Sequence, residues 1–240
     1  MTPFAADGSA PIVSGKSRFM AITFAGLLLA SGAALLMGWL SEEVLEGDTS
    51  RFDASVRGVV HAHATAQLTA DMWFFTDMGS VLVVTCTLAA TLAIFWFCRW
   101  RAAALTLAVT MAGSALLVVL LKLGFHRQRP VPYFGITVPD SFSYPSGHAL
   151  FSFAFFVMVA MLLSVHIRSR WLRAAVWIAA AIIIGLIGLS RIYLGVHYPS
   201  DVVAGYLSAS IWVLMVRLGY RVYGSARTHF LLAGINGTKT

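Results

Sequence analysis

Residues 143–156 read SYPSGHALFSFAFF, in which a proline, a small polar pair and a histidine directly precede an apolar run. The apolar run, residues 149–165, is close to the ~20 residues that a helix needs to cross a bilayer. Proline fixes its own φ and biases the residue before it toward extended geometry, so Tyr144 is expected to lie outside the helix. The stretch therefore predicts a membrane-spanning helix that begins directly after a polar, non-helical leader.

Five more apolar blocks predict the same architecture for the rest of the chain. Hydrophobic residues make up 59% of the 240 residues and charged residues only 11%, and the mean hydropathy is +0.81. These values lie outside the usual range of soluble domains. The fold class is therefore expected to be all-α, an integral-membrane bundle of six transmembrane helices. The expected spans are residues 19–40, 81–98, 102–121, 149–165, 171–189 and 202–216.

The distribution of Lys and Arg predicts how this bundle is oriented. With the N-terminus inside, eleven of the 17 basic residues fall on the cytoplasmic side and six on the other side. The positive-inside rule then places both termini in the cytoplasm. We expect a disordered tail at residues 1–17, a membrane domain at residues 18–222 and a cytoplasmic tail at residues 223–240.

Three outer connections join the six spans, at residues 41–80, 122–148 and 190–201. In this topology they face the periplasm or exterior of a multi-pass protein of the inner (plasma) membrane. The first connection is long and acidic, with an apolar stretch at residues 72–75. It is consistent either with a helix that lies in the membrane interface or with a solvated acidic connection.

Basic side chains in the second and third outer connections lie where the positive-inside rule disfavours them. Lys122, Arg129 and Arg191 each stand where a connection meets a helix end, with Arg127 beside them. Snorkelling to the headgroup layer explains a single residue of this kind. Three of them, in connections that also hold two histidines and an aspartate, predict a cluster around one anion.

The two histidines indicate the chemistry of such an anion site. Ser146, Gly147 and His148 precede the fourth apolar block, and the N–H groups of a helix N-terminus bind anions. An imidazole there can donate a proton to a departing oxygen. His197 and Asp201 are four residues apart, so the carboxylate can orient one ring nitrogen while the other attacks phosphorus.

Three segments carry a resemblance to a known family. They read KLGFHRQRP (residues 122–130), PSGH (residues 145–148) and SRIYLGVHYPSD (residues 190–201). They resemble K-x6-R-P, P-S-G-H and S-R-x5-H-x3-D, the three signature motifs of the type 2 phosphatidic acid phosphatase family. This family is also called the lipid phosphate phosphatase and haloperoxidase superfamily. Every fixed position matches in order, and the resemblance implies a helical bundle with its site at the outward-facing end.

The resemblance also implies a role for each motif residue. His197 is expected to be the nucleophile that forms a phosphohistidine, Asp201 its orienting partner, and His148 the general acid. The outer loops lack the carboxylate cluster of a two-metal phosphatase, and cations already supply the compensating charge, so no metal and no other cofactor are expected. The phosphoryl oxygens are expected to contact Lys122, Arg129, Ser146, Gly147 and Arg191.

The function implied is hydrolysis of the phosphate or diphosphate head of a membrane lipid. Undecaprenyl diphosphate is the foremost candidate, followed by phosphatidylglycerophosphate, phosphatidate and lipid A phosphate. The alternative is a lipid phosphotransferase that passes the phosphoryl group to another lipid or sugar hydroxyl. The expected partners are thus a lipid phosphate substrate and the bilayer, and the sequence predicts no oligomeric state.

Three other classes of protein are disfavoured. The net charge of +7 could attract nucleic acid, but the basic residues lie at the ends of apolar blocks and form no separate domain. A transporter is disfavoured because no Asp or Glu falls within any of the six blocks. Haloperoxidases with these motifs are soluble enzymes, unlike a chain with six spans.

Overall fold

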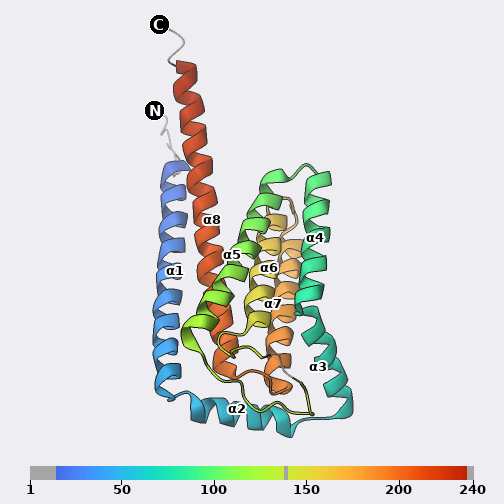
Figure 1. Ribbon diagram of the computed structural model, residues 1–240. Helices are drawn as coiled ribbons and strands as arrows, with labels where there is room; N and C mark the ends of the chain where they lie inside the picture. Colours follow the sequence, from blue (N-terminus) through green and yellow to red (C-terminus); the bar gives the residue numbers. More distant parts are fainter. Residues whose placement is uncertain (1–14, 138–139, 237–240) are drawn as a thin grey trace, which may run out of the picture.

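A computed structural model describes residues 15–137 and 140–236 of the chain, with side chains over residues 20–137 and 140–220. These residues form eight α-helices and no β-strand (Figure 1). The helices are α1 (Gly15–Glu46), α2 (Ser50–Ala62), α3 (Ala66–Met78), α4 (Val81–Phe97), α5 (Arg101–Phe125), α6 (Gly147–Ser164), α7 (Arg170–Tyr193) and α8 (Pro199–Asn236).

Five helices, α1, α5, α6, α7 and α8, are long and apolar enough to cross a membrane. The remaining expected span, residues 81–98, coincides with α4, which has only 17 residues. α3 and α4 together are long and apolar enough, with a bend of 51° between them. The all-α membrane bundle is therefore confirmed, and it has six spans when the bent pair is counted as one.

Local sequence explains where several helices begin. Thr65, Ser80 and Ser169 each occupy an N-cap, where the side-chain oxygen accepts a hydrogen bond from the N–H three residues later. Pro199 is the first residue of α8, a position that suits proline because a first helical residue needs no N–H donor. Ser80 and Ser169 thus start α4 and α7 at the boundaries of apolar blocks, whereas Thr65 starts α3 within the first connection.

α6 packs against α4, α5, α7 and α8, and it contributes five of the twelve buried residues of the main hydrophobic core, more than any other helix. α1 stands at the edge of the bundle beside α8 (Figure 1). α8 approaches α6 closely at Gly205, where a Cβ atom would lie 2.7 Å from the carbonyl oxygen of Ser146. This close approach sets the beginning of α6 directly beside the first turns of α8.

All three expected outer connections lie at one end of the bundle, at the bottom of Figure 1. We call it the site end. α2 lies across this end, next to the α5–α6 connection (residues 126–146) and the α7–α8 connection (residues 194–198). The first residues of α1 and the last residues of α8 lie at the other end, which we call the opposite end.

The first outer connection, residues 41–80, is helical over most of its length. α1 continues to Glu46, α2 follows, and α3 carries the apolar residues 72–75. Met72 is buried against Tyr193 and Leu194 of the α7 end, so α3 packs on the bundle and is not a solvated connection. Of the expected tails, residues 15–17 belong to α1 and residues 223–236 to α8, while residues 1–14 and 237–240 lie outside the described residues.

Candidate active site

The motif residues lie at helix ends that meet at the site end. Lys122 and Arg191 are in the last turns of α5 and α7, and His148 and Asp201 are in the first turns of α6 and α8. Hydrogen bonds and electrostatic interactions connect them across the end of the bundle. The residues that the structure brings to this end are Lys122, Arg129, Ser146, Gly147, His148, Arg191, His197 and Asp201.

His197 is buried, with 2% of its surface exposed, and its two ring nitrogens have different partners. Nδ1 lies 3.3 Å from Oδ2 of Asp201, and Nε2 lies 3.2 Å from Nη1 of Arg129. A guanidinium group can only donate, so Nε2 is the acceptor and the ring proton is assigned to Nδ1. Burial, opposed by Asp201, lowers the pKa of His197 to about 4, so the ring is neutral at neutral pH.

Asp201 is fully buried and surrounded by hydrogen-bond donors. Its Oδ1 accepts from Nη1 of Arg127 at 2.6 Å. Its Oδ2 accepts from the Tyr198 N–H at 2.9 Å and from the Ser143 hydroxyl, besides facing His197. These donors hold the carboxylate in one orientation toward the imidazole.

Arg127 connects Asp201 to α2. Its Nη2 donates to Oδ2 of Asp53 at 2.8 Å, and Asp53 also accepts from the N–H and the hydroxyl of Ser200 at 3.0 and 2.7 Å. Burial lowers the pKa of Arg127, but Asp201 and Asp53 outweigh it and the net shift is upward. The series Asp53, Arg127, Asp201 and His197, which we call the buried ion-pair chain, thereby ties α2 to the first turn of α8.

The α5–α6 connection and the neighbouring backbone position Arg129 and Lys122. Arg129 donates to the carbonyl oxygen of Ser141 at 2.8 Å, to its hydroxyl at 3.0 Å, and to the carbonyl oxygen of Val196 at 3.1 Å. Lys122 donates to the carbonyl oxygen of Phe142. Burial lowers the pKa of Arg129, and Asp201 opposes this shift. Both cations are thus held at the rim of the site by neutral partners.

The α3–α4 bend forms another wall of the site. Arg191 donates through Nη1 to the hydroxyl of Thr76, near the end of α3. A Cβ atom at Gly79, within the bend, would lie 3.0 Å from Cδ2 of His148 and 2.6 Å from Cγ2 of Ile187. Only glycine therefore fits at the bend without displacing the ring of His148 or its neighbour.

Ser146 occupies the N-cap of α6, yet its side chain makes no capping hydrogen bond. Its N–H donates to the carbonyl oxygen of Asp201 at 2.9 Å. Its hydroxyl and the Nε of Arg191 are both buried without a hydrogen-bond partner in the described part of the chain. Buried polar groups are normally paired, so these two groups are suited to a ligand with several acceptor oxygens.

Sequence reasoning missed three contributors to this site, namely Asp53, Arg127 and Ser143. The sequence did indicate Arg127, because it is a further basic residue where the positive-inside rule disfavours one, but its partners could not be inferred from the sequence. Asp53 is one of several carboxylates in the first outer connection, and no spacing distinguishes it from the others. Ser143 stands two residues before Pro145, in the polar leader, without a motif of its own.

The chemistry available at this site is that of anion binding and nucleophilic attack. Within residues 20–137 and 140–220, no three His, Cys, Asp or Glu side chains are placed together to hold a metal ion. The site presents cations, a hydroxyl group and a helix N-terminus around the unprotonated nitrogen of a neutral imidazole. This arrangement can bind a phosphoryl group and attack it.

Comparison with known sequences agrees with this chemistry. Residues 103–223 match the PAP2 superfamily. The undecaprenyl-diphosphatase of Sulfolobus acidocaldarius is 28% identical over 167 residues, which cover 68% of this chain and 75% of that protein. Phosphatidylglycerophosphatase B of Bacillus subtilis is 31% identical, over 47% of this chain and 56% of that protein. Lipid A 1-phosphatase of Rhizobium etli is 32% identical, over 46% of this chain and 47% of that protein, so these last two matches span about half of each relative.

Two solved structures share the fold. A transmembrane PAP2-type phosphatidylglycerolphosphate phosphatase from Bacillus subtilis superposes with a TM-score of 0.73 at 24% identity, over 78% of this chain and 94% of that one. LpxE of Aquifex aeolicus superposes with a TM-score of 0.50 at 24% identity, over 69% of this chain and 94% of that one. At such identities the likeness establishes the arrangement of helices alone.

Proposed function

The chain belongs to the PAP2 superfamily, and from this premise we propose that it hydrolyses the phosphate or diphosphate head of a membrane lipid through a phosphohistidine intermediate. The orientation of His197 is the observation that carries the proposal. Its Nε2 faces a cation and its Nδ1 faces a buried carboxylate. A nitrogen nucleophile needs this orientation, because one nitrogen must carry the proton while the other attacks.

In the first step, Nε2 of His197 attacks the phosphorus atom of the substrate. An N–P bond forms while the P–O bond to the lipid, or to the outgoing lipid phosphate, breaks. Asp201 stabilises the positive charge that develops on the ring. His148, at the N-terminus of α6, donates a proton to the departing oxygen.

The cations of the site would hold the phosphoryl oxygens during this transfer. Arg129 would move its Nη1 contact from Nε2 of His197 to a phosphoryl oxygen, while Lys122 and Arg191 contact the others. The Ser146 hydroxyl and Arg191 Nε, which lack hydrogen-bond partners within the described residues, would gain them from the phosphate. Arginine suits this role because its planar group binds phosphate in a bidentate manner.

In the second step, water attacks the phosphohistidine while His148 accepts its proton, and the N–P bond breaks to release inorganic phosphate. Charge on the transferring oxygens is stabilised by the three cations and by N–H groups at the start of α6. We therefore propose that the reaction proceeds without a metal ion.

An apolar groove beside His148 supports a lipid as the substrate. The groove has a volume of about 360 Å³ and lies among α4, α5 and α6. It begins at Val81, two residues after Gly79, and includes Phe151, one turn after His148. Along α4 it extends to Leu92, about 16 Å at 1.5 Å per residue. An apolar chain of the substrate would lie in this groove while its head occupies the site.

Among lipid phosphates we place undecaprenyl diphosphate first. The groove can hold an isoprenoid chain, and the undecaprenyl-diphosphatase of Sulfolobus acidocaldarius matches 68% of this chain, more than the other two sequence relatives described above. We also propose that the site faces the periplasm or exterior of the inner membrane. Within residues 20–137 and 140–220, six arginines and no acidic residue lie at the opposite end, which the positive-inside rule assigns to the cytoplasm.

Phosphate release from a panel of lipid phosphates, measured on the purified protein in detergent, tests this function. We expect release with chelator present and no acceptor added, and inhibition by vanadate, whose five-coordinate adduct resembles the transition state. His197→Ala should lower the rate by at least about 10³-fold, as loss of a nucleophile does.

Each part of the proposal has its own contrary result. Wild-type rates in His197→Ala would exclude the phosphohistidine. Full inhibition by chelator, restored by Mg²⁺, would contradict the metal-free reaction. Phosphate release from phosphatidate with none from polyprenyl diphosphate would overturn the choice of substrate, and release only with an added hydroxyl acceptor would indicate a phosphotransferase.

A further inference from the structure

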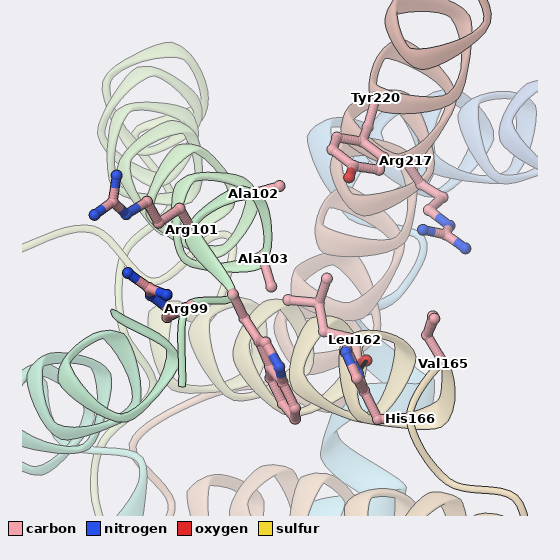
Figure 2. A pocket seen from close by; sticks show the side chains of 10 residues that line it. Arg99, Arg101, Ala102, Ala103, Leu162, Val165, His166, Arg217 and Tyr220 are labelled. Carbon is pink, nitrogen blue, oxygen red and sulfur yellow. Dashed lines mark hydrogen bonds between the residues drawn. The ribbon is translucent and has the colours of Figure 1, made fainter. Parts of the chain in front are cut away.

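A second pocket lies at the opposite end of the bundle (Figure 2). It has a volume of about 520 Å³ and is bounded by the α4–α5 turn, the last turn of α6 and residues 217–220 of α8. Arg101, in its wall, and Lys122, in the candidate active site, are 21 positions apart on α5, or about 30 Å. The hydrolysis proposed above makes no use of this pocket.

Aromatic and apolar side chains form much of the pocket wall. Trp100 stacks on His166, with ring centroids 3.6 Å apart and an interplanar angle of 14°. Tyr220 of α8 stands across from His166, Leu162 lies between them, and Val165 lies beside His166 (Figure 2). Trp and Tyr are typical of the lipid headgroup level, so the wall has the composition expected at the edge of a bilayer.

Three arginines stand at the rim of this pocket. Arg99 and Arg101 extend from the α4–α5 turn, and Arg217 extends from α8 on the other side of the mouth (Figure 2). The described lining thus carries three positive charges and no carboxylate. A pocket with an apolar wall and a cationic rim matches an amphiphile whose head is negative.

Membrane orientation by itself does not require such a pocket. The positive-inside rule needs only basic residues close to helix ends. Arg168, in the turn between α6 and α7, and Arg170, the first residue of α7, meet this need as exposed side chains that do not line the pocket. The cations of the α4–α5 turn and of α8 differ because they surround a concave, aromatic wall.

We propose that this pocket binds the phosphate group of an anionic phospholipid from the leaflet at the opposite end. Guanidinium groups bind phosphate in a bidentate manner, and basic pockets between membrane helices accept anionic headgroups. Arg99, Arg101 and Arg217 all extend outward from the mouth in Figure 2, so they turn about their flexible stems to reach the headgroup. The glycerol portion lies against Trp100 and Tyr220 in the pocket wall.

Lipid binding to the purified full-length protein, measured by native mass spectrometry, tests this proposal. The probes are phosphatidylglycerol, zwitterionic phosphatidylcholine and inorganic phosphate. We expect phosphatidylglycerol to bind more tightly than phosphatidylcholine, and Arg99→Gln/Arg217→Gln to weaken its binding about tenfold or more. Arg168→Gln/Arg170→Gln removes the same charge outside the pocket and should change binding less than twofold.

The two double variants distinguish binding in the pocket from a general attraction of anionic lipid to basic residues. Equal weakening in both would show the general attraction and overturn the proposal, as would equal binding of the two lipids. Inorganic phosphate that displaces the lipid at similar concentration would assign the site to the free anion. If the Arg99→Gln/Arg217→Gln variant does not fold, Arg99→Gln and Arg217→Gln are measured separately. Each should weaken the binding of phosphatidylglycerol several-fold. Lipid bound at the candidate active site contributes equally to every variant, so failure of the proposed hydrolysis leaves this test unaffected.

Discussion

Asp53→Asn is expected to slow formation of the phosphohistidine about 10²-fold, although Asp53 does not touch the substrate in the proposed mechanism. Asp53 lies on α2 and is fully buried, where it accepts hydrogen bonds from Arg127 and Ser200. An asparagine has nearly the same shape but carries no charge, and its single carbonyl oxygen cannot accept from both Arg127 and the Ser200 N–H, which contact different oxygens of Asp53. The substitution therefore interrupts the buried ion-pair chain at the contact between Asp53 and Arg127, and Arg127 is the residue that contacts Asp201.

The magnitude follows from the contacts that are lost. Removing one partner of a buried ion pair costs about 3–5 kcal/mol. The cost here should be near 3 kcal/mol, because Arg127 keeps its 2.6 Å contact with Asp201 and its side chain is 16% exposed. Arg127 would then shift toward Asp201, and a displacement of about 1 Å in the groups that orient a nucleophile can cost about 10²-fold in rate.

Single-turnover measurements distinguish a positioning role from simple loss of folded protein. Fewer folded molecules would lower the amplitude of the phosphohistidine burst, whereas a misplaced His197 lowers its rate constant. We expect the rate constant to fall about 10²-fold and KM to change less than about twofold, because the phosphate-binding cations are untouched.

Asp71→Asn is the matched control. Asp71 is an exposed carboxylate on α3, also at the site end, and it accepts a hydrogen bond from the side chain of Gln67, one turn away. This control should keep the wild-type rate constant. An unchanged rate constant in Asp53→Asn, or an equal loss in Asp71→Asn, would refute the positioning role of the buried ion-pair chain.

Three further predictions concern the reacting groups and the groove. Gly79→Ala would place a Cβ atom 3.0 Å from the ring of His148, so turnover should fall about tenfold or more as the proton donor shifts. Because the pKa of His197 is lowered to about 4, the ring is neutral above that pH and protonated below it. The rate of phosphohistidine formation should therefore show an acid limb in which it falls as the pH drops through about 4, in a pH series of single turnovers. Ala112→Trp would fill the apolar groove and should raise KM about tenfold for a long-chain lipid phosphate but not for a short-chain phosphate ester.

Controls and contrary results accompany each of these predictions. Gly58→Ala adds the same methyl group on α2 where no atom lies within 4 Å, and it should keep the wild-type turnover. Leu116→Trp introduces the same side chain on an exposed face of α5 outside the groove and should leave KM unchanged. Wild-type turnover in Gly79→Ala, or an acid limb near the ordinary histidine value of about 6.5, would contradict the geometry. If Ala112→Trp raised KM equally for short-chain substrates, the substitution would be acting on the phosphate-binding site and not on the groove.

Hydropathy predicted the bundle well because a bilayer makes the folding of each span a local matter. In hydrocarbon every backbone N–H and C=O must be paired within its own helix, so a long apolar block is by itself enough to indicate a span. The exception is α4, a helix of only 17 residues that qualifies as a span only together with α3. The apolar stretch at residues 72–75 belongs to the same bent span, and nothing in the local pattern indicates that α3 and α4 join at 51°.

The sequence by itself determined the membrane class of the chain, its apolar blocks and the motif residues from Lys122 to Asp201, because these depend on residue type and short spacing. Only the tertiary structure decided which distant polar groups meet. Asp53 contacts Ser200 across 147 positions, and the arginine-rimmed pocket joins the α4–α5 turn to α8. The physical reason is that a buried charge takes its partners from whichever helix ends pack beside it. Which residues become partners therefore depends on how the helices pack along their whole length, and this packing cannot be inferred from short spacings in the sequence.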